Sequence, residues 1–478
     1  MFCARFVRLL ASLLCLTPIW SLAQGPCPTQ VLQGTNARRS NSLICLVPQV
    51  YGAGGLVGID NGGPLLSTAQ FSHAAHFQQS SINSFSPINS EIGIQLSQQP
   101  LAAPSSGFLF AFQAGVMTQV QTESFGPLLT DRAETIGRHK LYVGFSYQYF
   151  NFDQADGINL RNFGAVHTHE LEPELCNPPN PNVPCLNGEP IFTRDIIATQ
   201  NRIDLKANQY TFVSTFGLTD KLDLSIALPI LNVRMDMYST ATIYNFEAQP
   251  PFNGRANHQF VVPAADPASQ PYVSQFYGVF YNHDSATGVG DLFFRAKYKA
   301  WQGEKSAVAV GADLRFPTGD AYNFLGSGAW GVRPFVTYSR SGRISPHGTL
   351  GFQINSDSIL ASDITQAVTT KGELPNILTY SAGADFLVMH RLSLTGDFIG
   401  QSLFSTPSIS QTTYTDFAGN PHLTLSSSRG TVTQGYIAVG GKYNPVAKLL
   451  ISANVLFTLT HEGLHSKPVP LIGVSYLF

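Results

Sequence analysis

The sequence predicts an all-β protein, namely a transmembrane antiparallel up-and-down β-barrel of about 12 strands, with about 14 possible. Apolar side chains alternate with small or polar ones along many runs of about ten to twelve residues, the length that crosses a bilayer when a strand is tilted. Only 12% of the 478 residues are charged, against about a quarter in an ordinary soluble domain. The connections between runs alternate between short and long, which is typical of an outer-membrane barrel and has no cause in a soluble sandwich.

The chain begins with a predicted secretory signal over residues 1–23. Arg5 and Arg8 precede the short apolar run Leu9–Leu16, and Ala23 ends a small-residue cleavage site. Beyond Ala23, no apolar stretch reaches the ~18–20 residues that a membrane helix needs. A membrane location therefore requires a barrel, and the predicted location is the outer membrane of a bacterial cell.

Residues 24–137 are predicted to form an N-terminal extension, because they do not share the rhythm of the strands that follow. Two short alternating runs, around Ile92 and around Phe110, are compatible with two further barrel strands, or with a hairpin that packs inside the barrel or caps its periplasmic mouth. The next stretch places charged residues such as Asp131 and Arg132 among apolar ones. It is either a plug whose charges meet charges on the barrel wall or a solvated linker.

The barrel itself is predicted to occupy residues 138–478. On one strand the apolar face changes from the side of Ile230 to that of Val233 and Met235, and Pro229 predicts a β-bulge at this change. Long loops are expected after residues 151, 239, 320, 356 and 404. The expected strands lie near residues 141–149, 210–218, 222–237, 292–300, 308–316, 330–338, 349–355, 378–388, 392–398, 434–443, 449–459 and 469–478.

A hairpin over residues 287–320 shows the expected facing most clearly. Leu314 and its neighbours at two-residue spacing form an apolar outer face, the opposite face carries charge, and the polar break at Gln302–Glu304 predicts the turn. Charges on the inner face either line a pathway and select solutes by polarity, or pair across strands and fill a modest bore. We expect most of them to pair and a subset to set selectivity. The set is Asp291, Arg295, Lys297, Asp313, Arg315, Arg333, Asp385 and Asp397.

Four cysteines remain after the predicted signal, an even number for a protein that is exported into an oxidising compartment. Their spacing does not fit a zinc site, so we expect structural disulfides. Closeness in sequence favours the pairs Cys27–Cys45 and Cys176–Cys185 among the three connectivities that four cysteines allow.

Two histidine pairs have spacings that are compatible with a metal ion, His73 with His76 and His167 with His169. Both pairs lie in polar segments outside the strand pattern, and neither has a clear third ligand nearby in the sequence. We therefore expect solvated loops at both places, and we predict no metal and no cofactor.

Composition and motifs argue against two other function classes. The net charge of −2 and the lack of a Lys/Arg cluster indicate no nucleic-acid partner. A barrel lipase or protease requires a Ser–His pair that a third polar group orients. Ser345 and His347 share a face, but they lie beside a predicted periplasmic turn, and the sequence has no Gly-x-Ser-x-Gly elbow. We expect a protein that is not an enzyme.

The segment GVGDLFFRAKYKAWQGEKSAVAVGADLRFPTGD resembles the meta-pathway phenol-degradation family of outer-membrane transport proteins. Gly288–Asp291 match the Gly-x-Gly-Asp strand start that is typical of the family. Arg315–Gly319 match its Leu-Pro-Thr-Gly-like strand end, with Phe316 where Leu is usual. The stretch FGLTDKLDLSIALPIL also resembles the family's strand-turn-strand, and the likeness extends over residues 140–478 or nearly so.

This resemblance implies passive uptake of small hydrophobic or aromatic compounds through a barrel that is surrounded by outer-membrane lipid. The last strand ends with Tyr476 and Phe478, which resembles the terminal signal that such barrels present to the barrel assembly machinery. The alternative is a structural or adhesive barrel, whose long Pro- and Asn-rich loops make contacts rather than allow passage.

Overall fold

A computed structural model of the chain describes residues 42–51, 76–99, 102–113, 116–127, 130–176, 185–250, 252–253, 258–263, 272–362, 371–389, 391–446 and 448–478. The predicted signal at residues 1–23, Cys27 and His73 lie outside these ranges. Among the described residues, no helix combines the length and the apolar character that crossing a membrane requires.

Twelve antiparallel strands form one closed barrel, which confirms the predicted fold and strand number. Each strand pairs with the next one in the barrel, and the last pairs with the first, where Ser475 lies opposite Gly144. Closure satisfies the backbone groups of the first and last strands, which lipid cannot do. The barrel strands are β3 (Leu141–Ala155), β8 (Ile196–Gly217), β9 (Leu222–Tyr244), β13 (Leu292–Gln302), β14 (Ser306–Phe316), β15 (Gly331–Arg340), β16 (Ile344–Asn355), β19 (Ile377–Met389), β20 (Leu392–Thr415), β21 (Pro421–Val446), β22 (Leu449–Thr458) and β24 (Val469–Leu477).

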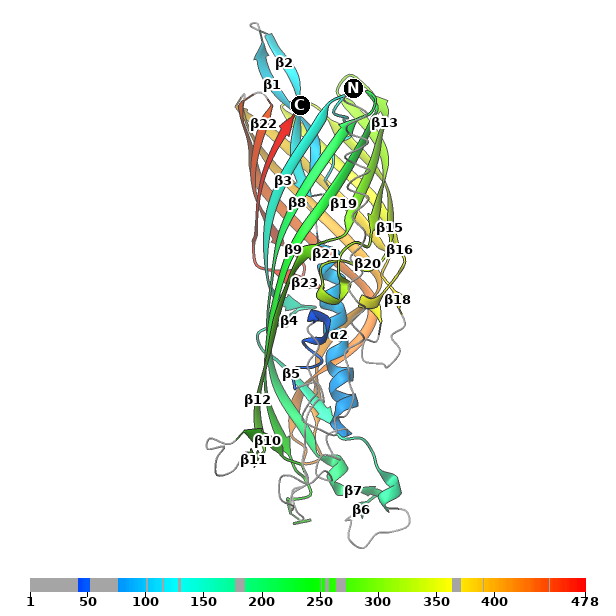
Figure 1. Ribbon diagram of the computed structural model, residues 1–478, viewed down its shortest axis with the longest axis vertical. Helices are drawn as coiled ribbons and strands as arrows, with labels where there is room; N and C mark the ends of the chain where they lie inside the picture. Colours follow the sequence, from blue (N-terminus) through cyan, green and yellow to red (C-terminus); the bar gives the residue numbers. More distant parts are fainter. Residues whose placement is uncertain are drawn as a thin grey trace.

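The two ends of the barrel differ, because short turns join the strands at one end and long connections join them at the other. We call these the short-turn end and the long-loop end. The C-terminus lies at the short-turn end, and the pairs β8–β9 and β20–β21 extend past the rest of the wall at the long-loop end (Figure 1). β21 has 26 residues, more than twice the ~9–11 of a membrane-spanning strand. Much of what is expected to be loop after residues 239 and 404 is therefore strand, so that part of the prediction is wrong.

The remaining elements lie mainly in the long connections. They are η1 (Leu43–Cys45), β4 (Ile158–Asn159), β5 (Phe163–Thr168), η3 (Pro173–Cys176), β6 (Cys185–Leu186), β7 (Glu189–Pro190), η4 (Ile191–Arg194), β10 (Phe260–Pro263), β11 (Tyr272–Gln275), β12 (Tyr277–Val289), η5 (Ala321–Asn323), β17 (Asp357–Ser358), η6 (Ile359–Ala361), β18 (Gly372–Glu373) and β23 (Leu464–Ser466).

The outer surface of the wall is apolar near the short-turn end and polar near the long-loop end. β15 alternates along its whole length between buried and exposed residues, and its exposed face includes Val332, Val336 and Tyr338. On the part of β8 near the long-loop end, Gln200 and Arg202 are exposed instead. The apolar part matches the outward band of a membrane barrel, and the polar part of the wall rises above it.

The inner face, in contrast, is polar near the short-turn end and apolar near the long-loop end. This change accounts for the shift of the apolar face on β9, so the bulge predicted at Pro229 is wrong. β9 keeps a single register with β8 along its length, so Val233 and Met235 are buried in the lumen instead of facing outward. The irregularity lies on the chain that pairs with the other edge of β9. Between the pairing of β12 and the pairing of β13 with β9, that chain has one residue more than β9. There the amide of Gly290 donates to the carbonyl oxygen of Pro229 at 2.8 Å. The apolar face changes because the lumen itself becomes apolar at this height.

The N-terminal extension enters the barrel as a helix, so the prediction of a strand around Ile92 is wrong. The helix is α2 (Gln78–Leu96), and it lies inside the extended wall (Figure 1). Ile88, Ile92 and Leu96 recur at the four-residue spacing of one helix face, and all three are buried. Ile94 is buried as well, because wall strands enclose the helix on more than one side.

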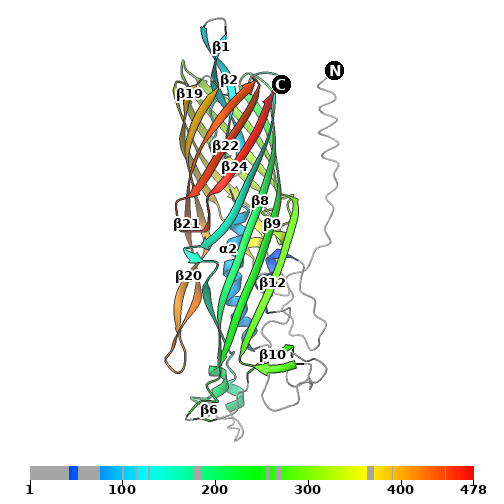
Figure 2. The same cartoon turned by 90° about the vertical axis from the view of Figure 1, so that its left-hand side faces the viewer.

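The run around Phe110 does form a strand, but it pairs with residues 116–127 and not with the run around Ile92, so the expected pairing of these two runs is wrong. It belongs to β1 (Ala102–Gln113), which pairs with β2 (Val116–Pro127) in a separate two-stranded sheet. This hairpin projects past the short-turn end of the barrel (Figure 2). The barrel therefore keeps twelve strands, and the possible increase to about 14 does not occur.

Candidate functional site

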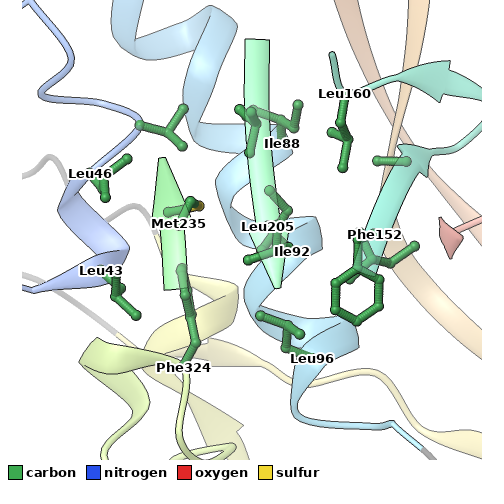
Figure 3. Packing of buried hydrophobic residues seen from close by; sticks show 14 of the residues in the cluster. Leu43, Leu46, Ile88, Ile92, Leu96, Phe152, Leu160, Leu205, Met235 and Phe324 are labelled. Carbon is green, nitrogen blue, oxygen red and sulfur yellow. The ribbon is translucent and has the colours of Figure 1, made fainter. Parts of the chain in front are cut away.

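The lumen near the long-loop end is lined with apolar side chains. Met235 and Leu205 on the wall and Ile88 and Ile92 on α2 are fully buried, and these residues gather around the helix (Figure 3). Phe152 on β3 belongs to the same cluster. Burial of an apolar side chain of this size contributes about 1.5–3 kcal/mol. The helix is therefore held inside the wall mainly by the hydrophobic effect.

Residues 43–50 form a second buried segment of the N-terminal extension in this half of the lumen. The side-chain Nδ2 of Asn89 on α2 donates to the carbonyl oxygen of Ile44 at 2.8 Å. The side-chain Nδ2 of Asn282 on β12 donates to the carbonyl oxygen of Leu46 at 3.0 Å. These bonds tie the segment to the helix and to the wall, and they satisfy backbone groups that would otherwise be costly to bury.

Nearer the short-turn end, the lumen holds a cluster of buried ion pairs around Asp313 on β14. Arg295 on β13 donates to Asp313 from Nε at 2.6 Å and from Nη2 at 3.0 Å. Arg333 on β15 donates to it from Nε at 2.8 Å. Both arginines lie directly opposite Asp313 in the ladders. Opposite charges in this arrangement stabilise neighbouring strands, as we expected for most of the inner-face charges.

Residues 130–136, which we call the lumen segment, meet the wall at this cluster, and all of them are buried. Asp131 accepts from Nη1 of Arg295 at 2.9 Å and from Nζ of Lys297 at 3.3 Å. Lys297 also donates to the carbonyl oxygen of Arg132 at 3.0 Å. The lumen segment is thus a charged partner of the wall, and the alternative of a solvated linker is wrong.

Arg132 joins the lumen segment to a second group of charges. Its Nε lies 3.3 Å from Oε2 of Glu134, and its Nη1 lies 3.2 Å from Oδ2 of Asp385 on β19. Asp385 also accepts from Nζ of Lys442 on β21 at 2.5 Å, and Glu134 accepts from the hydroxyl of Ser339 at 2.7 Å. Lys442 is absent from the predicted set, although its alternation with outward residues on β21 marks it as inward.

Asp291 and Arg315 lie between the apolar and the charged halves of the lumen. Asp291 accepts from the backbone amides of Gly319 at 3.1 Å and Ser327 at 2.8 Å, so it holds the connection that follows β14. Nε of Arg315 lies 3.8 Å from Oδ2 of Asp291, and its Nη1 donates to Oε1 of Gln98, just beyond α2, at 3.1 Å. This pair therefore links the wall, the connection and the N-terminal extension.

The structure thus places every residue of the predicted set on the inner face, with its side chain largely buried. The last of them, Asp397, lies 2.8 Å from Nε2 of His347. The hydroxyl of Ser345 donates to the carbonyl oxygen of Gly342 at 2.9 Å, so the Ser345 hydroxyl and the His347 ring are engaged with different groups. A role of these charges in selecting solutes stays a prediction.

The structure brings together one histidine from each predicted pair. Nδ1 of His76 lies 3.0 Å from Nε2 of His169 and 2.7 Å from Oε1 of Glu172. The expected solvated loop is wrong for His169, which is buried. His167 is buried in a different place, and burial lowers the pKa of its ring to about 3. Glu172 was missed in the sequence, although it follows His169 by only three residues.

The predicted disulfide between Cys176 and Cys185 is confirmed, and it lies in the connection between β5 and β8. Cys45 is also disulfide-bonded. Its predicted partner Cys27 lies outside the described residues, so that pairing stays a prediction.

Comparison with known proteins gives a family match and several likenesses to solved structures. The model of the family described as "Putative MetA-pathway of phenol degradation" matches residues 193–460, more than half of the chain. No curated protein sequence matches the chain.

Three solved outer-membrane proteins are similar to this chain. An outer-membrane channel from Pseudomonas putida F1 matches at a TM-score of 0.39 and 13% identity, over 72% of this chain and 98% of that chain. A FadL homologue from Pseudomonas aeruginosa matches at 0.30 and 11%, over 71% and 90%. The toluene transporter TodX from P. putida matches at 0.28 and 9%, over 72% and 91%. At these values the likenesses carry no conclusion about function.

Proposed function

Because the chain belongs to the family described as "Putative MetA-pathway of phenol degradation", we propose that it is a passive outer-membrane channel for small hydrophobic or aromatic compounds. Its short-turn end would face the periplasm and its long-loop end the outside, which is the arrangement of bacterial barrels. Tyr476 in β24 and Phe478, which follows the strand, are the residues that the assembly machinery would recognise. A passive channel needs no cofactor.

The observation that carries this proposal is the polarity of the lumen. A barrel that passes hydrophilic solutes has a polar, water-filled interior. Here the wall residues Met235, Met237 and Leu205 face inward on the part of the barrel that rises above the apolar outer band, and all three are fully buried. Side chains of α2 and of residues 43–50 cover this apolar surface. An apolar solute that enters from the long-loop end would therefore reach it when the N-terminal extension moves aside, and it would gain free energy by leaving water.

We further propose that residues 24–137 act as a plug. The lumen segment is held by Arg295, Lys297 and Asp385 on the wall, so a solute must displace it or pass beside it. Removal of one partner from a buried ion pair costs about 3–5 kcal/mol. This cost would hold the lumen segment in place, so the route would stay closed to ions until the segment moves.

Uptake by liposomes that contain the purified protein tests the channel. We expect passage of toluene or a small aromatic acid and little passage of a sugar of similar size. The variant Met235→Gln, which keeps the side-chain shape but adds an amide to the apolar lumen, should slow passage of toluene several-fold. Tyr238→Gln, on the exposed outer face of the same strand, is the matched control. A barrel that is sealed to all these solutes would contradict the proposal and favour the structural or adhesive alternative.

Removal of residues 24–137 tests the plug separately. Single-channel conductance of the truncated protein should exceed that of the full mature chain, because the lumen segment and α2 no longer occupy the lumen. Heat-modifiable mobility in gel electrophoresis shows whether the truncated barrel is folded. Equal conductance of two folded forms would show that the extension does not obstruct the lumen.

A further inference from the structure

The outer end of α2 meets the connection between β5 and η3 through three side chains that can bind a metal ion. His76 immediately precedes the N-cap residue Phe77 of the helix. His169 directly follows β5, and Glu172 directly precedes η3. His76 is 93 positions from His169 in the sequence, and the placement of α2 inside the barrel brings it to His169 and Glu172.

The geometry of the three candidate ligand atoms is close to that of a metal site. One ring nitrogen each of His76 and His169 and a carboxylate oxygen of Glu172 all lie within 4.8 Å of one another. The distances from His76 Nδ1 are 3.0 Å to His169 and 2.7 Å to Glu172. In a tetrahedral zinc site with bonds of about 2.0–2.2 Å, ligand atoms are about 3.3–3.6 Å apart. Side-chain rotations that move the ligand atoms by up to roughly 1 Å therefore make room for the ion.

The hydrogen bonds around His169 orient its ring as a ligand. Nδ1 of His169 lies 2.5 Å from the carbonyl oxygen of Glu170, and a carbonyl only accepts, so this nitrogen carries the proton. The neutral ring then directs the lone pair of Nε2 at His76. A backbone carbonyl that fixes the second nitrogen in this way is the usual support of a metal-binding histidine.

Nδ1 of His76 faces two further potential ligand atoms, Nε2 of His169 and a carboxylate oxygen of Glu172. A cation between the three groups interacts favourably with all of them. The carboxylate of Glu189 adds negative charge nearby, because it accepts from the backbone amide of Glu172 at 3.0 Å.

The candidate ligands are held in place and yet reachable from water. The amide of Glu170 donates to the carbonyl oxygen of His76 at 2.9 Å, and the Cys176–Cys185 disulfide restrains the chain just beyond Glu172. The side chains of His76 and Glu172 are 24% and 13% exposed. An ion can therefore enter from the long-loop end without unfolding the site.

We propose that His76, His169 and Glu172 bind a divalent transition-metal ion, with Zn²⁺ as the best match. Two imidazoles and one carboxylate are a common zinc ligand set, whereas Ca²⁺ and Mg²⁺ prefer sites made of oxygen ligands alone. The ion ties the outer end of α2 to the first long connection of the barrel. This site lies outside the apolar band and does not depend on what the channel transports.

Titration of the full mature protein with Co²⁺ and then with Zn²⁺ tests this proposal. After treatment with a chelator, the detergent-purified protein should take up one equivalent of Co²⁺ with the visible absorption of a four- or five-coordinate ion, and Zn²⁺ should abolish this absorption. His169→Ala should remove the Co²⁺ absorption, and Glu172→Gln should weaken Zn²⁺ binding at least ~10-fold, as loss of even an outer partner does.

His461→Ala is the matched control. His461 and His465 are stacked at the same end of the barrel, with their ring centres 6.2 Å apart, and they lie outside the three-residue group. This variant should bind Co²⁺ as the unchanged protein does. Failure of the unchanged protein to give a Co²⁺ spectrum would overturn the proposal even if the variants do not fold, and so would equal binding by unchanged protein and folded His169→Ala.

Discussion

Asp131 joins the lumen segment to the charged cluster on the barrel wall. It comes from the lumen segment, not from the wall, yet it accepts from both Arg295 and Lys297. Asp313 already engages Arg295 and Arg333, and with Lys297 the cluster holds three cations, so the carboxylate of Asp131 offsets one of the two positive charges that Asp313 leaves unbalanced. In a buried site such a balance matters, because an uncompensated charge is far more costly than in water.

Asp131→Asn should therefore loosen the lumen segment and leave excess positive charge at the cluster. We expect a destabilisation of about 3–5 kcal/mol at this contact and a shift of the reversal potential toward anion selectivity in a salt gradient. Asp220→Asn is the control, because Asp220 bonds to the amide of Arg138 at an exposed turn. The same reversal potential in both variants would mean that Asp131 does not control the charge of the lumen.

At the scale of elements, β9 shows how one strand serves two environments. Near the short-turn end its apolar residues face lipid, and beyond Pro229 its apolar residues Val233 and Met235 face the lumen. The register with β8 does not change, so the reversal is a property of the surroundings. A strand that rises above the bilayer has water outside and the apolar helix α2 inside.

This reversal predicts that an outward charge is harmful only within the apolar band. Leu314→Arg and Val455→Arg place a charge on outward positions that are 36% exposed, and each should impair assembly at a cost of about 2–4 kcal/mol near the midplane. Gln200→Arg makes a similar change on the outward face of β8 above the band and should be tolerated. The yield of folded, heat-modifiable protein measures the difference, and equal yields would place the band elsewhere.

Not every inward position is a suitable control for that experiment. Gly311 faces the lumen, and a Cβ added there would approach Cζ of Phe335 to less than 2.5 Å and the carbonyl oxygen of Ala296 to 2.6 Å. Even Gly311→Ser would therefore force these neighbours to move. Tight packing of the lumen, not polarity, is the reason.

At the scale of the whole molecule, closure of the barrel depends on the pairing of β24 with β3. Paired cysteines in a background without the native cysteines test this pairing. Ser475→Cys with Gly144→Cys should form a disulfide on oxidation, because the two residues lie directly opposite. Ser475→Cys with Ile94→Cys should not, because Ile94 belongs to the lumen helix. Cross-linking only in the second pair would show that the barrel closes through the N-terminal extension.

The pairing of β24 with β3 also predicts that deletion of Phe478 strongly reduces membrane insertion. The amide of Phe478 donates to the carbonyl oxygen of Leu141 at 2.8 Å, so deletion of Phe478 removes a bond of the closing pair as well as the aromatic end of the chain. This deletion should reduce membrane insertion more than removal of residues 406–430. Those residues form the paired tip of β20 and β21 beyond the rest of the wall. Greater loss from the tip deletion would contradict this view of assembly.

The sequence by itself determined the twelve strands, their facing near the short-turn end, the turns and the pairing of Cys176 with Cys185. These features are local: alternation follows from the pleat of a strand, and turn residues lie between neighbouring runs. The sequence also identified the inner-face charges, because they interrupt an apolar pattern.

Only the tertiary structure decided what fills the lumen. Ile92 and Ile94 alternate as on a strand, whereas Ile88 and Ile92 have the spacing of a helix face, and the helix forms because the wall encloses it on several sides. The facing of Val233 depends on how far β9 rises above the apolar band. The bonds of Arg132 to Asp385, and the approach of His76 to His169 and Glu172, join segments that are far apart in the chain. Local pattern carries no information about such contacts, because they arise from the closed shape of the barrel.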